Sequence, residues 1–436
     1  MNSAAHIDYG TEPSYSIPLA QLIAGCSGLN LARPVDGSIV IEQICDDSRL
    51  AGPFSMFVAI RGESHDGHQS VDQAVRSGAV AVVVEKGIIE KENLQSMESA
   101  VIEVEDTRAA LASLASAFYG NPASKMTMIG ITGTNGKTTV SYIIEQTLRE
   151  LGVQAGVIGT IEYRYELGNG QSIRQPAPLT TPDPLTLQKV LRKMADSGVS
   201  HVIMEASSHA LQQHRLGSVE FDLSIFTNLS QDHLDYHRTM TEYFAAKRRL
   251  FTHHMRSGGT VVVVEQSAGE NGQSPSADLA ALCRSLPLIT VVCGGAENCG
   301  VRLVDHAISL AGVDCEIADT KGQHYQIHSS LIGRFNINNL LAAFSALNSL
   351  GYEPDRLAKL IGNAAGAPGR IEPIRLASKP GGQPTVIIDY AHTPDALEKV
   401  LDALKSLPHE RLICVFGCGG NRDQSKRVLM GEITGA

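Results

Sequence analysis

The stretch that most constrains this chain is residues 126–139, where an apolar segment runs straight into a glycine-rich turn ending in Gly-Lys-Thr-Thr. The segment from Met126 to Ile131 predicts a buried strand, and the residues after Gly136 predict a helix. Backbone N–H groups in such a turn, together with the positive end of the helix, can bind polyphosphate oxygens. The sequence therefore predicts a nucleoside-triphosphate site on a strand–loop–helix unit.

The side chains of this turn have separable roles in the predicted site. Lys137 is expected to hold the β- and γ-phosphates, and the Thr138 hydroxyl a Mg²⁺ ion. The strict form of the motif has a glycine where this chain has Ile131, so the match is to a variant. A tight strand-to-helix turn with a chance lysine is the structural alternative. The predicted ATP-binding residues of the turn are Gly133, Thr134, Asn135, Gly136, Lys137, Thr138 and Thr139.

Length and charge narrow the class of protein. A chain of 436 residues is long enough for two or three domains, each with its own core. The 36 Lys and Arg residues against 46 Asp and Glu residues give a net charge of −10, which argues against a general nucleic-acid-binding protein. No stretch approaches the ~18 consecutive apolar residues of a membrane span. The N-terminus lacks the pattern of an export signal, so we expect a cytoplasmic protein.

The spacing of the cysteines bears on zinc binding and on disulfide formation. The eight cysteines are scattered, and no two of them form a Cys-x-x-Cys pair. Neither a zinc site nor a disulfide framework is indicated. We expect reduced, mostly buried thiols.

Breaks in the pattern predict three domains. The first part of the chain alternates short β-type and helical runs and ends at the breaker Tyr119-Gly120-Asn121-Pro122. A second break is the Ala/Gly/Pro-rich stretch 362–369, which follows a helical segment at 338–350. The expected domains are 1–121, 122–366 and 367–436.

Strand-like segments recur with helical segments between them, both after the phosphate turn and in the last part of the chain. This alternation predicts an α/β fold with a largely parallel sheet covered by helices. The expected strands, besides the one before Gly133, are 157–161, 201–205, 223–228, 260–265, 288–293, 385–389 and 412–416.

Polar residues follow two of these strands, where ligands bind in parallel sheets. Glu205 ends one strand, and His233 lies shortly after another. Their oxygen and nitrogen donors suit Mg²⁺ or Mn²⁺. Either residue alone would be a satisfied structural side chain, but two such strand ends beside a phosphate loop favour a functional site.

A series of motifs in fixed order gives the chain a family resemblance. The chain resembles the Mur ligases, in particular the branch that forms the UDP-N-acetylmuramoyl tripeptide. The motifs are Asp47-Ser48-Arg49, Phe57-Val58-Ala59, Asp66-Gly67-His68, Gly133 to Thr139, Leu179-Thr180-Thr181-Pro182, Met204 to Leu211, Thr227 to His237, Ala245-Ala246-Lys247, Gly333-Arg334-Phe335-Asn336, Pro368-Gly369-Arg370-Ile371-Glu372, Asp389-Tyr390-Ala391-His392-Thr393-Pro394-Asp395 and Phe416-Gly417-Cys418-Gly419-Gly420.

The resemblance implies an architecture and a reaction. It implies a UDP-sugar-binding N-terminal domain, a central P-loop ATPase domain with a parallel sheet, and a Rossmann-like C-terminal domain. The implied enzyme is an ATP-dependent ligase, a monomer, that joins a free diamino acid to UDP-N-acetylmuramoyl-L-alanyl-D-glutamate through an acyl phosphate. The diamino acid expected is meso-diaminopimelate rather than L-lysine.

The resemblance also implies a metal centre with two Mg²⁺ ions. One ion is expected at Thr138, and the second near Glu205 and His233. The family lysine that matches Lys247 is carbamylated and supports the second ion; from the sequence alone, Lys247 would be a solvated helix charge. Lys137, Glu205, His233 and Lys247 are therefore the expected catalytic residues.

Substrate contacts carry over from the resemblance as well. The expected contacts are Ser48 and Arg49 for the uridine diphosphate, Thr180, Thr181, Ser207, Arg215 and His392 for the rest of the sugar-peptide substrate, and Asn336, Asn339, Arg370 and Asp389 for ATP. Each has a structural alternative. Asn336 could cap the helix that follows it, and Asp389 could close an Asx turn.

Three departures from the family pattern leave alternatives open. An Asn-x-Asp-Asp motif is missing after the strand 261–266, and Asn421 replaces a family aspartate. The sequence also ends at Ala436, before the family's Asp-Asn-Pro-Arg motif that selects the amino acid. If the protein ends there, we expect the last domain to be incomplete and least stable, with an unpaired edge on a parallel sheet, weak ATP binding and no ligation. If a longer chain exists, we expect normal ligation.

Two alternatives to the ligase remain open. The first is a non-catalytic ATP- and UDP-sugar-binding relative or fragment, which the missing C-terminal motif favours. The second is a folylpolyglutamate synthetase, which shares the phosphate loop. The segment Asp47-Ser48-Arg49 counts against the second alternative.

Overall fold

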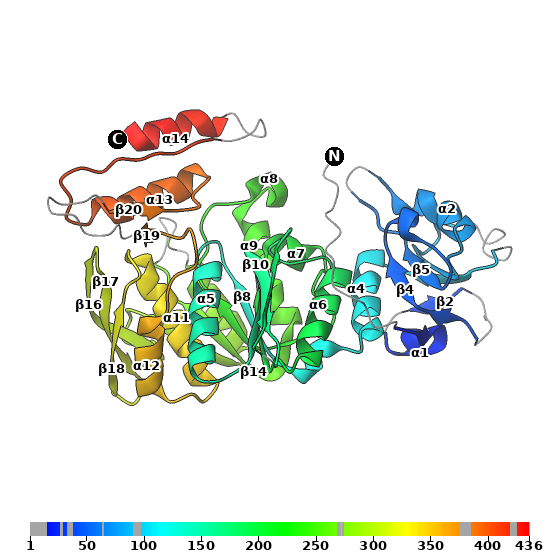
Figure 1. Ribbon diagram of the computed structural model, residues 1–436, viewed down its shortest axis with the longest axis horizontal. Coiled ribbons are helices and arrows are strands. Elements are labelled where there is room, and N and C mark those ends of the chain that lie inside the picture. The colour runs from blue at the N-terminus through cyan, green and yellow to red at the C-terminus, as the bar shows by residue number, and fades with distance from the viewer. Residues whose placement is uncertain are drawn as a thin grey trace. The chain divides into compact units, whose positions relative to one another are not determined.

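The structure, a computed structural model, describes residues 15–26, 29–32, 38–62, 65–89, 97–168, 170–267, 272, 274–374, 385–418 and 425–435. The chain forms two compact units (Figure 1). The first unit contains Met1–Lys125, Pro182–Ala195 and Gln213–Val219, and the second contains Met126–Thr181, Asp196–Gln212 and Glu220–Ala436. The three domains with boundaries at 121 and 366 stay a prediction.

The first unit is built on a five-stranded sheet in the order β2-β7-β6-β5-β4. Strands β4 to β7 are parallel, and β2 is antiparallel to β7. Asp106 caps the start of α4, because its carboxylate accepts hydrogen bonds from the N–H groups of Arg108 and Ala109. The bounds are β2 Asn30–Leu31, β4 Gln43–Cys45, β5 Ser55–Val58, α2 Val71–Arg76, β6 Ala81–Glu85, β7 Ala100–Val104 and α4 Thr107–Phe118.

The second unit is built on an eleven-stranded sheet in the order β11-β10-β9-β12-β8-β13-β14-β15-β16-β17-β18. Its centre, from β9 to β16, is parallel, and both ends are extended by antiparallel strands. The bounds are β8 Thr127–Thr132, β9 Ala155–Ile158, β10 Glu162–Glu166, β11 Ser172–Pro176, β12 His201–Glu205, β13 Phe221–Phe226, β14 Met255–Val264, β15 Ile289–Gly294, β16 Val301–Ser309, β17 Gly312–Asp319 and β18 His324–Ser329.

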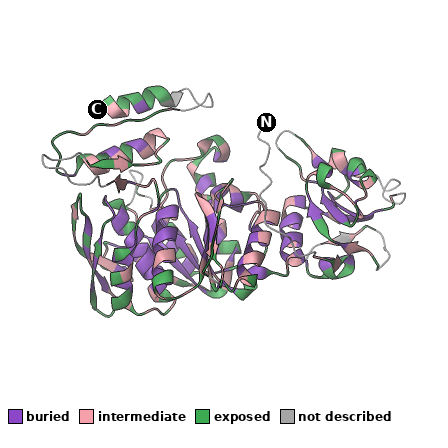
Figure 2. Ribbon diagram, viewed as in Figure 1, coloured by how far each residue is buried: buried purple, intermediate pink, exposed green. Residues whose placement is uncertain are grey.

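Two groups of helices pack on this sheet. Helices α5 and α11 contact each other and cover strands from β9 to β17, while α9 and α10 contact each other and pack on β8, β14 and β15. The central strands are buried on both faces (Figure 2), which explains their continuous apolar runs. The bounds are α5 Lys137–Glu150, α7 Ser208–Gln212, α8 Leu234–His237, α9 Met240–His253, α10 Pro275–Arg284, α11 Phe335–Ser349 and α12 Pro354–Asn363. Helix α6 (Pro184–Asp196) belongs, except for its last residue, to the first unit.

The structure confirms the largely parallel central sheet but corrects the expected strands after residue 366. The segment expected at 385–389 is β20 (Val386–Ile388), which pairs antiparallel with β19 (Glu372–Ile374) rather than entering a parallel sheet. The expected strand 412–416 is wrong. Its residues are not in a strand, because no neighbour in the described chain pairs with them, and Val415 is 94% exposed. Asn421 lies outside the described residues.

Two further features concern the helices and the thiols. No helix in the described part of the chain is long and apolar enough to cross a membrane. All eight cysteines are free and six are buried, as expected. Burial raises the pKa of the Cys293 thiol to about 12, so it remains a protonated packing group at neutral pH.

Candidate active site

The glycine-rich turn lies between β8 and α5, and two of its glycines have no room for a side chain. Gly133 has φ +147° and Gly136 has φ +89°, both in a region that L-residues avoid. A Cβ on Gly133 would collide with the Thr227 hydroxyl, and one on Gly136 would lie 2.5 Å from Asn339 Oδ1. The end of β13 and the first turns of α11 are therefore packed directly against the loop.

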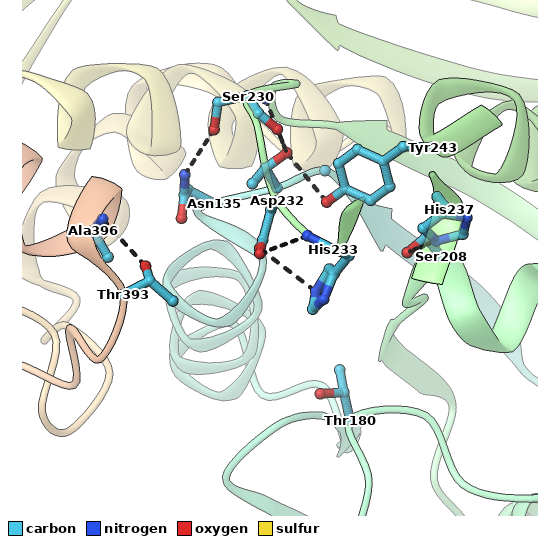
Figure 3. A network of polar contacts seen from close by, with 12 residues as sticks. Asn135, Thr180, Ser208, Ser230, Asp232, His233, His237, Tyr243, Thr393 and Ala396 are labelled. Atoms are coloured by element: carbon cyan, nitrogen blue, oxygen red, sulfur yellow. Dashed lines mark hydrogen bonds and ion pairs between the residues drawn. The ribbon is translucent and has the colours of Figure 1, made fainter. Parts of the chain in front are cut away.

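Hydrogen bonds fix the loop to the residues that follow β13. The backbone N–H of Thr134 donates to Asn228 O at 2.9 Å, and that of Asn135 donates to Asn228 Oδ1 at 2.9 Å. The Thr227 hydroxyl donates to Asn135 O at 2.6 Å, and Asn135 Nδ2 reaches Ser230 Oγ at 3.4 Å (Figure 3). The sequence identified this segment as a motif but gave Thr227, Asn228 and Ser230 no role.

Two lysines share one carbonyl of the loop. Lys137 Nζ donates to Gly133 O at 2.8 Å and to Thr134 O at 2.9 Å, and Lys247 Nζ from α9 donates to the same Gly133 O at 2.8 Å. Lys247 is only 1% exposed and lies over the Tyr243 ring, 4.3 Å from its centroid. The interpretation of Lys247 as a solvated helix charge is therefore wrong, since the sheet-facing side of α9 buries it.

Burial lowers the pKa of both amines. Desolvation lowers the pKa of Lys137. The pKa of Lys247 is lowered far below its ordinary value, first by burial and then by the positive charge of Lys137. The structure therefore favours a neutral amine at Lys247.

Glu205 ends β12 and accepts three hydrogen bonds on its carboxylate. The Thr138 hydroxyl donates to Oε2 at 3.0 Å, the Thr160 hydroxyl to Oε2 at 2.8 Å, and the Thr160 N–H to Oε1 at 3.2 Å. Glu205 is 1% exposed, and a Cβ on Gly159 would collide with Oε1. These clustered oxygens are the ligand type that Mg²⁺ prefers. Thr160 belongs to no motif, so the sequence analysis missed it.

His233 lies in a cluster of rings that includes Tyr243, the ring over which Lys247 lies. Its backbone is left-handed at φ +54°, and its Nε2 lies 3.5 Å from Asp232 Oδ2. Its ring centroid is 4.9 Å from that of His209. His237 Nε2 and Ser208 Oγ are 2.9 Å apart beside it, as Figure 3 shows. Burial lowers the pKa of His233, which favours the neutral ring.

The two expected ligands of the second metal ion are not in direct contact. Glu205 and His233 form no hydrogen bond or ion pair with each other, and the described residues include no group of three or more His, Cys, Asp or Glu placed to hold a metal. The structure brings together Thr138 with Glu205, and Lys137 with Lys247. His233 lies instead beside Asp232 and His209.

Three of the expected substrate residues lie close to Glu205. The Thr181 hydroxyl donates to the Glu205 carbonyl at 2.7 Å and accepts from the Ser207 N–H at 3.0 Å. Thr180 Oγ1 lies 3.1 Å from Thr160 Oγ1. These residues therefore meet at the carboxyl end of β12.

Three further expected substrate residues, Ser48, Arg49 and Arg215, belong to the first unit. Ser48 is buried, and its hydroxyl donates to Gln73 Oε1 at 3.3 Å. The Arg49 side chain is 81% exposed and pairs with Asp47. Arg215 donates to Gln213 Oε1 at 2.7 Å.

The asparagines expected on the adenine side are buried in the first turns of α11. Asn336 Nδ2 donates to Ile332 O at 2.8 Å, and Asn339 Nδ2 donates to Asn336 Oδ1 at 2.8 Å. The helix has no side-chain cap, so the capping alternative for Asn336 is wrong. Instead, the pair places Asn339 against Gly136 of the phosphate loop.

The residues expected to bind ATP from the last part of the chain form a local turn. Asp389 accepts from the N–H of Ala391 at 2.7 Å, the Asx turn given as its structural alternative, and from that of Ile371 at 2.8 Å. The Arg370 guanidinium lies 5.2 Å from the Tyr390 ring centroid, and His392 Nδ1 lies 3.0 Å from Tyr390 O. Their contacts to ATP and substrate stay predictions.

Gln266 stands where the family's Asn-x-Asp-Asp motif is missing, and it has a definite structural role. Its Oε1 accepts from the Leu229 N–H at 2.8 Å, and its Nε2 donates to Leu229 O at 3.2 Å. This paired contact fixes the segment that leads to Ser230 and His233. Sequence reasoning missed the contact, because it depends on the neighbouring positions of β13 and β14 in the sheet.

Comparison with known proteins places the chain in a family. The domain described as "Mur ligase family, catalytic domain" matches residues 40–119, the "Mur ligase middle domain" matches 131–347, and the "Mur ligase, glutamate ligase domain" matches 369–436. The UDP-N-acetylmuramoyl-L-alanyl-D-glutamate–2,6-diaminopimelate ligase of Geobacter metallireducens is 40% identical over 413 residues, which are 93% of this chain and 77% of that protein.

Solved structures agree with this placement. A structure of a UDP-N-acetylmuramoyl-L-alanyl-D-glutamate–2,6-diaminopimelate ligase matches with a TM-score of 0.71 and 28% identity, covering 92% of this chain and 78% of that one. The MurF ligase of Thermotoga maritima in complex with ADP shares the fold, with a TM-score of 0.54 and 20% identity over 84% of this chain and 75% of that one. The family resemblance and the α/β architecture expected from the sequence are confirmed. The chain belongs to the Mur ligase family of ATP-dependent amide-bond-forming ligases.

Proposed function

We propose that this Mur ligase adds a diamino acid, meso-diaminopimelate, to the D-glutamate of UDP-N-acetylmuramoyl-L-alanyl-D-glutamate in the cytoplasmic stage of peptidoglycan synthesis. The observation that carries the proposal is the convergence of Lys137, Lys247, Thr138 and Glu205 around the phosphate loop. The names of relatives that are 40% identical over 93% of the chain support the choice of substrates.

The reaction needs an activated carboxylate. The D-glutamate carboxylate attacks the γ-phosphorus of ATP, which gives an acyl phosphate and ADP. The amine of the amino acid then attacks the acyl carbon, phosphate leaves, and the amine loses a proton as the amide forms. Lys137 and the loop N–H groups stabilise the charge that develops on the phosphoryl oxygens, which is the main task of a site for this chemistry.

The residues near Glu205 fit the Mg²⁺ that the family implies. The Thr138 hydroxyl and the Glu205 carboxylate are already in contact, and both are oxygen donors at the carboxyl end of parallel strands. When bound, Mg²⁺ would neutralise charge on the phosphate oxygens. A second ion would take the His233 ring nitrogen as one ligand, and the lowered pKa of His233 suits it for that role.

Carbamylation of Lys247 follows from its neutral amine. A neutral amine attacks CO₂ to form a carbamate and releases one proton, whereas an ammonium cannot attack. The carbamate would be an anion beside Lys137, so it would attract the Lys137 ammonium in this buried site. It would also add an oxygen ligand for the second metal ion.

The proposed reaction is tested by product analysis. The natural protein is incubated with ATP, Mg²⁺, UDP-N-acetylmuramoyl-L-alanyl-D-glutamate and either meso-diaminopimelate or L-lysine. We expect phosphate release and a UDP-N-acetylmuramoyl tripeptide of the diaminopimelate mass. Preference for L-lysine would refute the amino acid, and nucleotide binding without ligation would favour the non-catalytic alternative.

The carbamate is tested with Lys247→Arg and with labelled CO₂. Arginine keeps a positive charge but cannot form the modification, so ligation should fall by at least about 10²-fold. Wild-type protein in ¹³CO₂ should show a carbamate ¹³C resonance that Lys247→Arg lacks. A fully active Lys247→Arg variant would count against the modification.

A further inference from the structure

Thr160 joins the carboxylate of Glu205 to the hydroxyl of Thr180. Its Oγ1 lies 2.8 Å from Glu205 Oε2 and 3.1 Å from Thr180 Oγ1. Thr160 follows β9, Glu205 ends β12, and Thr180 follows β11. One hydroxyl therefore bridges the phosphate side of the site and the side where the sugar-peptide substrate is expected.

The direction of these hydrogen bonds is fixed by proton counting. A carboxylate only accepts, and a threonine hydroxyl has a single proton. Thr160 gives that proton to Glu205, so it can only accept in its contact with Thr180. Thr180 must donate to Thr160, and its oxygen then offers only lone pairs to any further partner.

Neighbouring contacts hold Thr160 and Thr180 in these positions. The N–H of Thr160 donates to Glu205 Oε1 at 3.2 Å. On the other side, the Tyr163 hydroxyl donates to Leu179 O at 2.7 Å, and the Thr181 hydroxyl donates to Glu205 O at 2.7 Å. The residues before and after Thr180 are therefore both anchored, which limits its side chain to few orientations.

We propose that Thr160 is a positioning residue that makes Thr180 a hydrogen-bond acceptor for an N–H or O–H group of the sugar-dipeptide substrate. This role rests on the proposed function, because it takes that substrate to bind at Thr180. It also gives Glu205 a second task. The carboxylate orients Thr160, and through it Thr180, in addition to serving the phosphate side of the site.

The experiment measures substrate binding without ATP or metal. The dissociation constant of UDP-N-acetylmuramoyl-L-alanyl-D-glutamate is determined by calorimetry for wild type, Thr160→Val and Thr160→Ser. Valine keeps the shape and removes the hydroxyl, and we expect binding to weaken on the order of 10-fold. Serine restores the hydroxyl and should bind within about 2-fold of wild type. Circular dichroism shows whether the valine variant folds. If it does not, Thr160→Ala, which also lacks the hydroxyl, takes its place in the experiment.

A matched control distinguishes the positioning role of Thr160 from the general effect of removing a buried hydroxyl group. Thr147 is a buried threonine of α5 whose hydroxyl donates to Ile143 O at 2.8 Å. Thr147→Val removes a similar bond away from the proposed contact. We expect it to leave substrate binding unchanged, and weakening equal to that of Thr160→Val would overturn the proposal.

A double-mutant cycle tests the link itself. If Thr160 acts through Thr180, the Thr160→Val/Thr180→Val double variant should bind no more weakly than Thr180→Val alone. Additive losses, or Thr160→Ser binding as weakly as Thr160→Val, would overturn the proposed role while leaving the ligase function intact. Wild-type protein that fails to bind the sugar dipeptide would instead overturn the proposed function, and this role with it.

Discussion

Lys247 and Lys137 lie within hydrogen-bond distance of the same oxygen, the Gly133 carbonyl. Two ammonium groups so close would repel each other strongly in a site where water is excluded. The lowered pKa of Lys247 relieves this repulsion, since one of the pair then carries no proton. At the scale of single residues, the loop therefore keeps one dedicated cation, Lys137, and one reactive amine.

The Lys137→Ala variant tests the role of Lys137 as the cation of the phosphate loop. We expect Lys137→Ala to lower the rate of ADP formation by at least about 10²-fold, because a charge contact to the transition state is lost. Binding of the UDP-sugar substrate should be largely retained, since its expected contacts include Ser48 and Arg49 of the first unit. ADP release and calorimetric binding are measured on one preparation, and equal loss of both would contradict separate sites.

The lowered pKa of Lys247 makes the free energy of unfolding depend on pH. An unfolded lysine keeps its proton to about pH 10.4, whereas folded Lys247 releases it at lower pH. In that window the unfolded chain binds one more proton, so the free energy of unfolding rises with pH, by at most about 1.4 kcal/mol per unit. Urea unfolding in CO₂-free buffer should show the free energy of unfolding of wild type rising relative to that of Lys247→Met as the pH approaches about 10, the ordinary range of a lysine. A constant difference would contradict the shift.

Lys137 and the phosphate loop could be predicted from the sequence, because these residues are adjacent in the chain. The contacts of Thr160 and Gln266 and the burial of Lys247 could not be predicted from the sequence. The contact of Thr160 depends on β9 lying beside β12, and that of Gln266 on β14 lying beside β13. The burial of Lys247 depends on which face of α9 meets the sheet. His233 was found from its position after a strand, but its separation from Glu205 depends on how the chain turns after β13.

At the scale of elements, the loop is confined by β13 and α11. Glycine is needed at position 136 for two separate reasons, the positive φ of +89° and the approach of Asn339. Strand propensity explains why the central parallel strands were predicted, since each is a continuous apolar run. The antiparallel extension from β16 to β18 was missed, because its residues alternate between buried and exposed and lack that signal.

Gly136→Ala should weaken ADP binding at least about 10-fold, because the new methyl group displaces Asn339 or the loop. Gly152 is the matched control. It also has a positive φ, +78°, but no atom lies within 4 Å of where its Cβ would be. Gly152→Ala shares the backbone strain without the collision, so calorimetry should show near-normal ADP binding. Similar losses in both variants would mean that backbone strain alone is responsible.

At the scale of the whole molecule, the two compact units have separate hydrophobic cores. Leu114 of α4 is fully buried in the core of the first unit, and Leu148 of α5 in that of the second. The phosphate loop, both lysines and Glu205 all belong to the second unit. Damage to one core is therefore expected to affect the two substrates differently.

Leu114→Ala should destabilise the first unit by about 2–5 kcal/mol and weaken UDP-sugar binding more than ADP binding. Leu148→Ala, the reciprocal variant, should do the opposite. The chain contains no tryptophan, so unfolding is followed by circular dichroism and by limited proteolysis with mass spectrometry of the fragments. Loss of both binding activities together in each variant would show that the units unfold as one.

The segments that meet at the phosphate loop are far apart along the chain. Thr132 ends β8, Glu205 ends β12, and Asn339 lies in α11, so more than two hundred positions separate the first from the last. A chain that ends before Asn339 lacks part of this site, and such distant pairings form late and slowly during folding. Nucleotide binding therefore reports completed folding of the second unit. Bound nucleotide should also protect this unit from heat and proteases by mass action, so the ATP level of a cell would act on the lifetime of the enzyme as well as on its turnover.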